Sequence, residues 1–573
     1  MALPYFPWKH LVLMTGVLVF AGRYCYAQNV PSSADPGRQS SPIEKQQDRF
    51  PDIKPFDPTV QRARAPDLSP ETAQTTFIFN SLTITGAQAF TDETLGSYYQ
   101  RYVGQEITVS QLFDVLKDIQ QLYQDHGYTI SKVSMPEQNI QSGHIIFNVI
   151  EGYVSKIDID PQIIPSDLID SFSEDILAMR PLNTIRLERL MLILNDRPQL
   201  DVAAVISATD DQLPGAVKIT LKPLNTHEQL TRYIGFDNHG SNFTGAGQVT
   251  AGGNFSQGLP NYSDLDLFLI QTTSAQEMRQ AGAAYHLPVF GISGAMLNIS
   301  SNMTRTEPGD TLDVLDVQGK STSITATLSY PLIRQREEAW MVSAGLSYKN
   351  VLTNLLQDRL FDDRTRSLFI DTKYSFSDRY LGLNAFQASY HQGFNIWGAR
   401  ETGSIDLSRE AGRSDFRKVE LSASRLQQLT GSLDLLGRVK GQYAWDPLLS
   451  SEEFGFGGSD LGRGYDPSEL TGDKGISASL ELRYKNNLRF QEHHPWVYQL
   501  YGFYDIGKVW NIDPGSKNMV SGASVGLGTR LWINDHYQFD FNLSVPLTNP
   551  ADNPPQYANG SSPRALFSFK YQF

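Results

Sequence analysis

Cysteine is almost missing from this chain of 573 residues, which contains only Cys25, near its start. If the segment that contains Cys25 is removed on maturation, the protein has no disulfide bond, no thiol nucleophile and no thiolate metal site. Charged residues make up only 19% of the chain, and the formal net charge is -14. Nucleic acid is therefore not expected as a partner, because phosphate binding needs a basic surface.

Two further absences argue against ATP as the energy source and against a fold of transmembrane helices. The sequence has no G-x-x-x-x-G-K-[ST] motif, so nothing in it predicts binding of ATP. It also lacks a long hydrophobic run, since the apolar stretch Leu11–Ala21 is too short to span a bilayer as a helix. With a mean hydropathy of -0.32, the chain is too polar for a bundle of transmembrane helices.

The N-terminal apolar stretch fits a secretory signal. It follows basic residues and precedes a small-x-small cleavage site at Cys25–Ala27, so residues 1–27 are expected to be removed before Gln28. A lipidated Cys25 is the alternative, which the large Tyr24 before it disfavours.

Aromatic residues, by contrast, are abundant, with 26 Tyr and 30 Phe, and many lie in segments that alternate between apolar and polar positions. In Ala565–Phe573 one face is apolar and aromatic, while the other carries serine, lysine and glutamine. Segments 324–330, 418–424 and 476–485 alternate in the same way and confine their charges to one parity. A charge facing lipid costs about 2–4 kcal/mol near the midplane but little in a wet lumen. The pattern therefore predicts transmembrane strands.

We count about 16 such strands from Leu230 onward, and an even number is expected of a bacterial barrel. Their connections alternate between short turns and long loops. Short connections are predicted at Val289–Ile292, Asp378–Arg379, Thr430–Gly431 and Ile533–His536, and long ones at Arg305–Gln318, Val351–Asp363, Ile396–Arg413, Asp446–Asp473 and Pro546–Arg564. Residues 226–573 are therefore expected to form a 16-stranded transmembrane antiparallel β-barrel of the outer membrane. A row of soluble β-sandwiches is the alternative, and it would show no such asymmetry of loops.

The segment before the barrel divides into a leader and two compact units. Residues 28–76 are polar and proline-rich, which indicates a linker, although Ser41 can cap a short helix from Pro42 to Phe50. A leader without a helix is the alternative. Residues 77–152 and 153–225 each show the order β-α-α-β-β.

In the first unit we expect strands at Phe77–Ile84 and Tyr128–Val133 and a helix that begins with the capping box Thr108-x-x-Gln111. Both units are α+β domains with exposed sheet edges and no catalytic cluster. We therefore expect binding modules that add a strand of a client protein, and the loop asymmetry places them in the periplasm.

One long loop and one strand carry residues that suggest a mechanism. The loop Asp446–Asp473 is rich in glycine, which favours tight folding in a confined space, and its tip is Leu461, Gly462, Arg463, Gly464 and Tyr465. Two strands later, the motif F-x-D-x-G comprises Phe503, Asp505 and Gly507, and the parity of Asp505 points it into the lumen. Arg463 and Asp505 can then pair and hold the loop inside the pore. A solvated loop arginine with an ordinary lumen carboxylate is the alternative.

Signals of catalysis or metal binding are weak. Gly522–Gly526 matches G-x-S-x-G, but it lies in an alternating strand and not in a strand-to-helix turn. His493 and His494 have no partners at the spacing of zinc ligands. The sequence predicts neither an enzyme nor a cofactor.

The order of leader, two small units and barrel, together with the loop tip and the F-x-D-x-G strand, resembles the TpsB transporters of two-partner secretion. These are the exporters of haemolysins and filamentous haemagglutinins, and the resemblance covers residues 77–573. It implies that the two units are POTRA domains that capture an unfolded client. It also implies that Arg463 contacts Asp505 inside the pore and that an N-terminal helix plugs the barrel. Gly462 stands where the family usually has valine.

The function implied by this resemblance is export of a large haemolysin-like or adhesin-like exoprotein across the outer membrane, by type V two-partner secretion. Expected partners are this client, outer-membrane lipids and the barrel assembly machinery, but neither nucleic acid nor ATP. Phe569, Tyr571 and Phe573 would form the C-terminal assembly signal, and folding of the client outside would drive export. An assembly insertase of the same superfamily is one alternative, although insertases usually carry more POTRA units. A passive porin is another, and it would need no periplasmic receptor.

Overall fold

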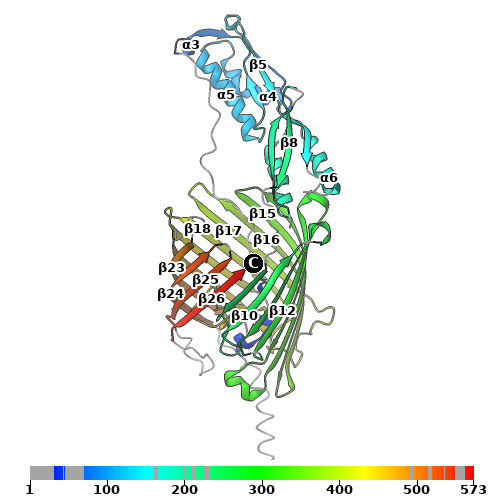
Figure 1. Cartoon of the computed structure of the whole chain (residues 1–573), viewed down its shortest axis with the longest axis vertical. Helices are drawn as coiled ribbons and strands as arrows, with labels where there is room; N and C mark the ends of the chain where they lie inside the picture. The colour runs from blue at the N-terminus through cyan, green and yellow to red at the C-terminus, as the bar shows by residue number, and fades with distance from the viewer. Residues whose placement is uncertain are drawn as a thin grey trace, which may run out of the picture.

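The computed structural model places two small α/β units at one end of a β-barrel (Figure 1). It describes residues 31–42, 44, 70–159, 166–197, 200–209, 213–223, 232–256, 258–274, 276–488, 496–513, 519–534, 536–548 and 562–573. The expected secretory signal, residues 1–27, and residues 45–50 of the expected plug helix lie outside the described residues. No helix in the described ranges is both long enough and apolar enough to cross a membrane.

Sixteen of the described strands form one closed antiparallel barrel, which confirms the predicted fold class. Pairing of β9 (Arg232–Asp237) with β26 (Arg564–Gln572) closes it. The strands between them are β10 (Gln248–Phe255), β11 (Asp264–Thr272), β12 (Met278–Val289), β13 (Ala295–Thr306), β14 (Gln318–Arg334), β15 (Glu338–Leu355), β16 (Asp358–Ser377), β17 (Gly382–Gly393), β18 (Arg417–Gln428), β19 (Leu433–Ala444), β22 (Lys474–Leu488), β23 (Trp496–Trp510), β24 (Met519–Ile533) and β25 (Tyr537–Pro546).

Side chains of the barrel strands are sorted by parity, as the alternation predicts. In β22, Leu480 and Leu482 point outward and are about half exposed. Ser479 and Glu481, at the intervening positions, are buried inside the barrel. The outer wall is therefore apolar and the lumen polar, which is the arrangement that a bilayer around a wet pore requires.

One predicted loop is wrong. We expected a long connection over Val351–Asp363, but β15 continues to Leu355 and β16 begins at Asp358. Leu356 and Gln357, both with positive φ, form the two-residue turn between them. Charged residues near this turn are paired with the next external loop, residues 394–416. Arg400 there lies 3.1 Å from Asp362.

The first small unit contains more strands than we predicted. Its elements are α3 (Pro70–Gln74), β1 (Thr76–Phe79), β2 (Ser81–Thr85), α4 (Asp92–Tyr99), β3 (Gln105–Thr108), α5 (Val109–Asp125), β4 (Lys132–Ser134) and β5 (His144–Ile150). The predicted strand Phe77–Ile84 is in fact two strands in different sheets, because β1 pairs with β3 and β2 pairs with β5. The strand predicted from Tyr128 begins only at Lys132. The capping box at the start of α5 is present, with hydrogen bonds of 2.9 and 3.2 Å.

The second unit repeats the arrangement of the first. It contains β6 (Tyr153–Ile159), α6 (Ser166–Leu177), α7 (Thr184–Asn195), β7 (Val202–Ala208) and β8 (Ala216–Pro223). Its sheet order β6-β8-β7 matches β2-β5-β4, with one parallel and one antiparallel pairing in each. Each unit buries a separate apolar core between its helices and its sheet.

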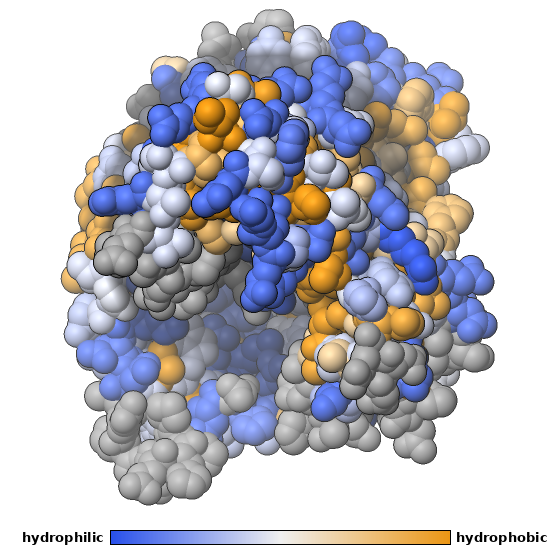
Figure 2. Space-filling view, turned by 90° about the horizontal axis from the view of Figure 1, so that it is seen from above, coloured by the Kyte–Doolittle hydropathy of each residue, from blue (hydrophilic) through white to orange (hydrophobic). Residues whose placement is uncertain are grey.

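Both units lie at the end of the barrel where the connections are short. Residues 290–294 join β12 to β13 at this end, and residues 378–381 join β16 to β17. The longest described connection, residues 445–473, leaves from the opposite end. Short turns face the periplasm in barrels of this kind, so the two units are periplasmic. Figure 2, viewed from the periplasmic end, shows the units over one side of the barrel and a hollow with hydrophilic side chains beside them.

The second unit is fixed to the barrel through α7. Arg334, at the periplasmic end of β14, donates two hydrogen bonds of 2.7 and 2.6 Å to the carboxylate of Asp196. Arg189 of α7 donates to the carbonyl oxygens of Pro331 and Leu332 at 2.6 and 3.0 Å. Arg197 also donates to the carbonyl oxygen of Gly291. These contacts hold the second unit at one side of the mouth and leave the other side open.

Asp196→Ala should loosen this junction. The bidentate pair is partly buried, so its loss should raise the undocked population about fivefold, equivalent to roughly 1 kcal/mol. Distance distributions between spin labels on the second unit and on the barrel should broaden accordingly. Glu174→Ala, at an exposed position of α6, is the matched control. Equal broadening in both variants would contradict a specific role for the Arg334–Asp196 pair.

Candidate functional site

The connection between β19 and β22, residues 445–473, enters the barrel, and we call it the pore loop. Its short strands β20 (Phe454–Phe456) and β21 (Leu470–Gly472) pair with each other and form a hairpin stem. Phe456, Arg463 and Tyr465 are among the largest fully buried side chains of the described residues. An arginine and a tyrosine at a loop tip are normally solvated, so their burial means that the tip occupies a fitted site on the inner wall.

Arg463 is the centre of this site. Its guanidinium group donates to both carboxylate oxygens of Asp505, at 2.9 and 2.8 Å, and its backbone N–H donates to Asp505 Oδ2 at 3.1 Å. Its Nη1 lies 2.5 Å from Glu481 Oε2. Asp505 and Glu481 are fully buried, and Arg463 is only 2% exposed. Buried charges of this kind are tolerated only when they are paired and hydrogen-bonded.

The F-x-D-x-G strand supplies three different contacts to the loop. The ring of Phe503 lies 3.4 Å from Arg463 Cζ, a cation–π contact on the face of the guanidinium group. Asp505 supplies the ion pair. Gly507 leaves room for the ring of Phe456, since a β-carbon at this position would come within 2.3 Å of that ring. Each residue of the motif thus makes its own contact with the loop: Phe503 a cation–π contact, Asp505 an ion pair and Gly507 a steric fit.

Gly462 stands where the family usually has valine, and the backbone conformation at this position accounts for the difference. It has φ of +78°, and a β-carbon there would lie 2.8 Å from the ring of Phe456. Valine is strained at such a φ, so the backbone of this tip depends on glycine. In this conformation the N–H of Gly462 donates to Asp505 Oδ2 at 3.2 Å. The backbone of the tip thus contacts the same carboxylate as the Arg463 side chain.

The remaining tip residues fix the loop to the neighbouring strands β24 and β25. Tyr465 donates to the carbonyl oxygen of Ala523 at 3.0 Å, and Ser544 donates to the carbonyl oxygen of Arg463 at 2.7 Å. Gly464 approaches the wall so closely that a β-carbon would lie 2.8 Å from that of Ser524. Leu461 is also largely buried. The structure therefore brings all five predicted tip residues and Phe503, Asp505 and Gly507 into one site.

Glu481 is the site residue that sequence reasoning missed. It accepts from Arg463, Arg530 and Arg483 at 2.5, 2.9 and 2.8 Å, so it connects the loop to two cations of the wall. The alternation in β22 had already placed Glu481 in the lumen. Its partner was not predictable, because alternation does not fix the register that sets Glu481 opposite Phe503 in β23.

The N-terminal segment Pro31–Pro42 also lies inside the barrel, where Figure 1 shows it in dark blue. Ser33, Asp35 and Ser41 are buried there. Ser41 Oγ accepts from the N–H of Glu44 at 3.1 Å, and the Glu44 carboxylate accepts from the N–H of Ser41 at 2.9 Å. This capping box starts a helix at the position where the sequence predicts one.

A cavity of about 780 Å³ is lined on one side by residues 37–40 and 44 and on the other by strands β14 to β19. Its lining is mainly hydrophilic and includes Lys349, Gln387, Ser389, Lys418, Glu420 and Ser422. Several of these charges are paired, since Lys418 lies 2.9 Å from Glu420, and Lys349 and Lys418 both lie 3.1 Å from Glu452 of the pore loop. A polypeptide in this space would therefore meet hydroxyl, amide and charged groups.

The other candidate residues lie away from the pore loop. Tyr571 and Phe569 stack on Tyr537 of the adjacent strand, with ring centroids 4.9 and 6.5 Å apart, and Phe573 is about half exposed. Gly522–Gly526 lies within β24, and its serine faces the tip of the pore loop, far from any strand-to-helix turn. His493 and His494 lie outside the described residues.

One group of metal-ligand type occurs among the described residues, at the periplasmic end of the lumen. Ligand atoms of Asp264, Asp266 and His286 lie within 4.8 Å of one another. Asn254 donates to both carboxylates at 2.5 and 2.9 Å, and His286 is hydrogen-bonded to Asn298 at 2.7 Å. The group is therefore a complete hydrogen-bonded network that needs no ion.

Comparisons with known proteins agree with this architecture. Residues 215–529 match the family model "Haemolysin secretion/activation protein ShlB/FhaC/HecB", and residues 77–152 match "POTRA domain, ShlB-type". The heme/hemopexin transporter protein HuxB of Haemophilus influenzae is 23% identical over 488 residues, which cover 81% of this chain and 82% of HuxB. The outer membrane transporter CdiB of Dickeya dadantii is 26% identical over 416 residues, 71% of each chain.

Solved structures show the same fold. CdiB from Escherichia coli superposes with a TM-score of 0.75 at 19% identity, over 91% of this chain and 94% of CdiB. CdiB from Acinetobacter baumannii gives a TM-score of 0.66 at 17% identity, over 93% and 96% of the two chains.

Proposed function

Since this chain belongs to the haemolysin secretion/activation protein family ShlB/FhaC/HecB, we propose that it exports one large, unfolded exoprotein through the lumen of its barrel. It is an outer-membrane protein whose POTRA domains lie in the periplasm. The observation that carries the proposal is the combination of two periplasmic binding units with a polar lumen closed by the chain's own loop. A client captured below the mouth would enter this lumen and leave at the cell surface.

The periplasmic units are suited to binding an extended chain. In the described sheet of the second unit β7 is an edge strand, and its Val205 and Ile206 are 42% and 38% exposed. The outer edge of β2 in the first unit is likewise unpaired among the described strands. A client segment can add to such an edge through backbone hydrogen bonds, while apolar side chains supply local contacts. We assign capture of the client to these edges.

The lumen is suited to passage without tight binding. Hydroxyl and amide side chains on the β14 to β19 wall offer many weak hydrogen bonds to a sliding chain. Arg463 anchors the tip of the pore loop to β22 and β23, and a client on the β14 to β19 side would pass beside residues 451–455 of the loop, which line the same cavity. Export then depends on folding of the client outside, which prevents its return.

The structure favours an exporter over two alternatives. A passive porin needs an open lumen, whereas the pore loop and residues 31–42 occupy much of this one. An insertase of the same superfamily shares the loop and the POTRA fold, but the described residues contain only two such units. We also propose that Phe569, Tyr571 and Phe573 serve the barrel assembly machinery as a C-terminal signal and then contact outer-membrane lipids.

Deletion of the gene distinguishes the three functions. Quantitative proteomics of the medium and cell surface should show loss of one very large protein, with degraded fragments of it in the periplasm. The outer-membrane protein profile should not change. A general loss of barrel proteins from the outer membrane would instead indicate an insertase. An unchanged set of surface proteins with slower uptake of small solutes would indicate a porin.

A further inference from the structure

Three cationic side chains form a row across neighbouring strands near the extracellular end of the barrel: Arg279 of β12, Arg305 of β13 and Lys320 of β14. Arg305 is directly opposite Arg279 in one strand pair and directly opposite Lys320 in the next. We propose that this basic row binds the phosphate groups of a lipid headgroup in the outer leaflet of the outer membrane. The site goes beyond export, because it does not depend on a client.

The parity of the strands places the basic row on the lipid side of the wall. Met303 in β13 and Ile324 in β14 share the parity of Arg305 and Lys320, and they are 58% and 44% exposed. Thr304, at the intervening position of β13, is buried. The three cations are themselves exposed. A ligand of the basic row must therefore approach from the membrane and not from the lumen.

The basic row lies at the height of the outer-leaflet headgroups. Residues 307–317 join β13 to β14 at the end of the barrel opposite to the two periplasmic units. Tyr330 is exposed on the same face of β14 as Lys320, ten positions further along the strand. Ten residues of a tilted strand rise about 25 Å, which is the height of the apolar band of such barrels. Tyr330 therefore lies near the periplasmic interface of the bilayer and Lys320 near the outer one.

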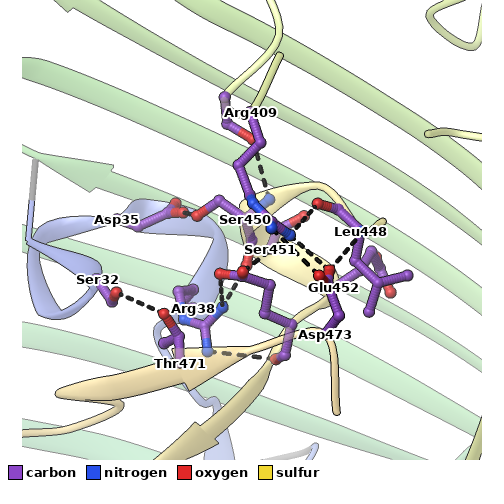
Figure 3. Close-up of polar contacts among 12 residues, drawn as sticks. Ser32, Asp35, Arg38, Arg409, Leu448, Ser450, Ser451, Glu452, Thr471 and Asp473 are labelled. Carbon is purple, nitrogen blue, oxygen red and sulfur yellow. Dashed lines mark hydrogen bonds and ion pairs between the residues drawn. The ribbon is translucent and has the colours of Figure 1, made fainter. Parts of the chain in front are cut away.

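The basic row lacks the carboxylate partners that other cations of the barrel have. In the lumen, for example, Arg409 lies 2.5 Å from Asp473 (Figure 3). Among the described residues, neither Arg305 nor Lys320 has an ion pair or a side-chain hydrogen bond. The connection between their strands nevertheless carries four carboxylates, those of Glu307, Asp310, Asp313 and Asp316.

The register makes this arrangement unfavourable without a ligand. Residues that are directly opposite on neighbouring strands have β-carbons about 4.5–5.5 Å apart, and like charges in such positions are destabilising. Two such pairs follow one another here, because Arg305 is opposite a cation on each side. An anion bound over Arg305 would contact all three side chains and remove the repulsion.

A lipid phosphate fits both the charge and the surroundings of the basic row. Arginine and lysine are the usual donors to phosphate oxygens, and basic residues at a membrane surface attract anionic lipids. Towards the midplane, the same faces of β13 and β14 carry apolar side chains that are 43–58% exposed, namely Ile299, Met303, Ile324 and Leu328. Acyl chains would cover this apolar surface, whereas free phosphate or an acidic protein would use the charges alone.

Titration of the full-length protein with lipid, followed by native mass spectrometry, tests the proposal. The probe is diphosphoryl lipid A, added to delipidated protein in detergent. The double variant Arg305→Ala with Lys320→Ala should need a roughly tenfold or higher concentration for half occupancy. Lys132→Ala with Arg186→Ala is the matched control, because it removes the same charge from exposed positions of the periplasmic units and should leave binding unchanged.

The same titration with lipid A lacking both phosphates separates recognition of the phosphate from contact with acyl chains. This lipid should bind the unchanged chain as weakly as diphosphoryl lipid A binds the double variant. Equal affinity of the unchanged chain for the two lipids would overturn the proposal. So would equal affinity of the unchanged chain and the double variant for diphosphoryl lipid A.

Thermal unfolding provides a second readout, which also shows whether the variants fold. In lipid-free detergent the double variant should be at least as stable as the unchanged chain, because it loses the repulsion between like charges. Diphosphoryl lipid A should raise the Tm of the unchanged chain by about 2 °C or more and that of the double variant by less. Lys320→Arg, which keeps the charge, should retain the shift. Equal shifts in the unchanged chain and the double variant would contradict binding at the basic row.

Discussion

Substitution of Arg463 by alanine should abolish export of the client while leaving the barrel folded in the outer membrane. The substitution leaves Asp505 buried without its cation, and breaking a buried pair in this way costs about 3–5 kcal/mol. The tip would leave the wall, so single-channel conductance should change together with secretion. Asp505→Ala should give the same phenotype, and the double variant should be little worse than either single one, as expected of directly coupled partners.

Two further substitutions make this test specific. Arg463→Lys should not restore export, because lysine cannot make the two-point contact with Asp505 or cover the ring of Phe503 in the same way. Exchange of the charges, Arg463→Asp with Asp505→Arg, should recover only part of the function. Arg379→Ala is the control, since Arg379 is an exposed arginine in the turn between β16 and β17, outside the lumen and outside the contacts of the tip. Normal secretion by Arg463→Ala would show that the pore loop is not a working part of the exporter.

Deletion of residues 77–223 should leave an inserted barrel that neither binds nor secretes the client. Pairing of β9 with β26 closes the barrel without any strand of the periplasmic units, and each unit has its own core. Removal of both units therefore leaves the closed sheet intact. Secretion assays and co-purification with the client measure the loss. Heat-modifiable migration of the barrel in gels provides the folding control. Continued secretion without the two units would contradict their role as the receptor.

The strands and loops of the barrel were predictable because lipid and water impose opposite demands on alternate residues. Alternation placed Asp505 and Glu481 in the lumen, and the lengths of the connections identified the periplasmic end. The same reasoning failed at Val351–Asp363, because contacts with the next loop, such as that of Asp362 with Arg400, lie between residues far apart in sequence. It also joined β1 and β2, although the buried positions change parity at Asn80, from Phe77 and Phe79 to Leu82.

Contacts between segments far apart in sequence were not predictable. The resemblance to a family implied that Arg463 meets Asp505, but the position of Glu481 depends on strand register. Residues 32–39 carry no periodic pattern, and their fit inside the barrel depends on Gly319 and Gly455 in distant parts of the chain. Ser41 was recognisable as a helix cap because its partner, Glu44, is only three residues away.

The route of the client is tested most directly by photo-cross-linking of a stalled export intermediate. The client identified by proteomics would be fused to a stably folded domain that halts it in transit. A photoreactive residue at Gln387, which lines the cavity, should cross-link to the stalled client. The same residue at the adjacent Phe386, which is 47% exposed on the outer face, should not. Cross-links at Phe386 with none at Gln387 would contradict passage of the client through the lumen.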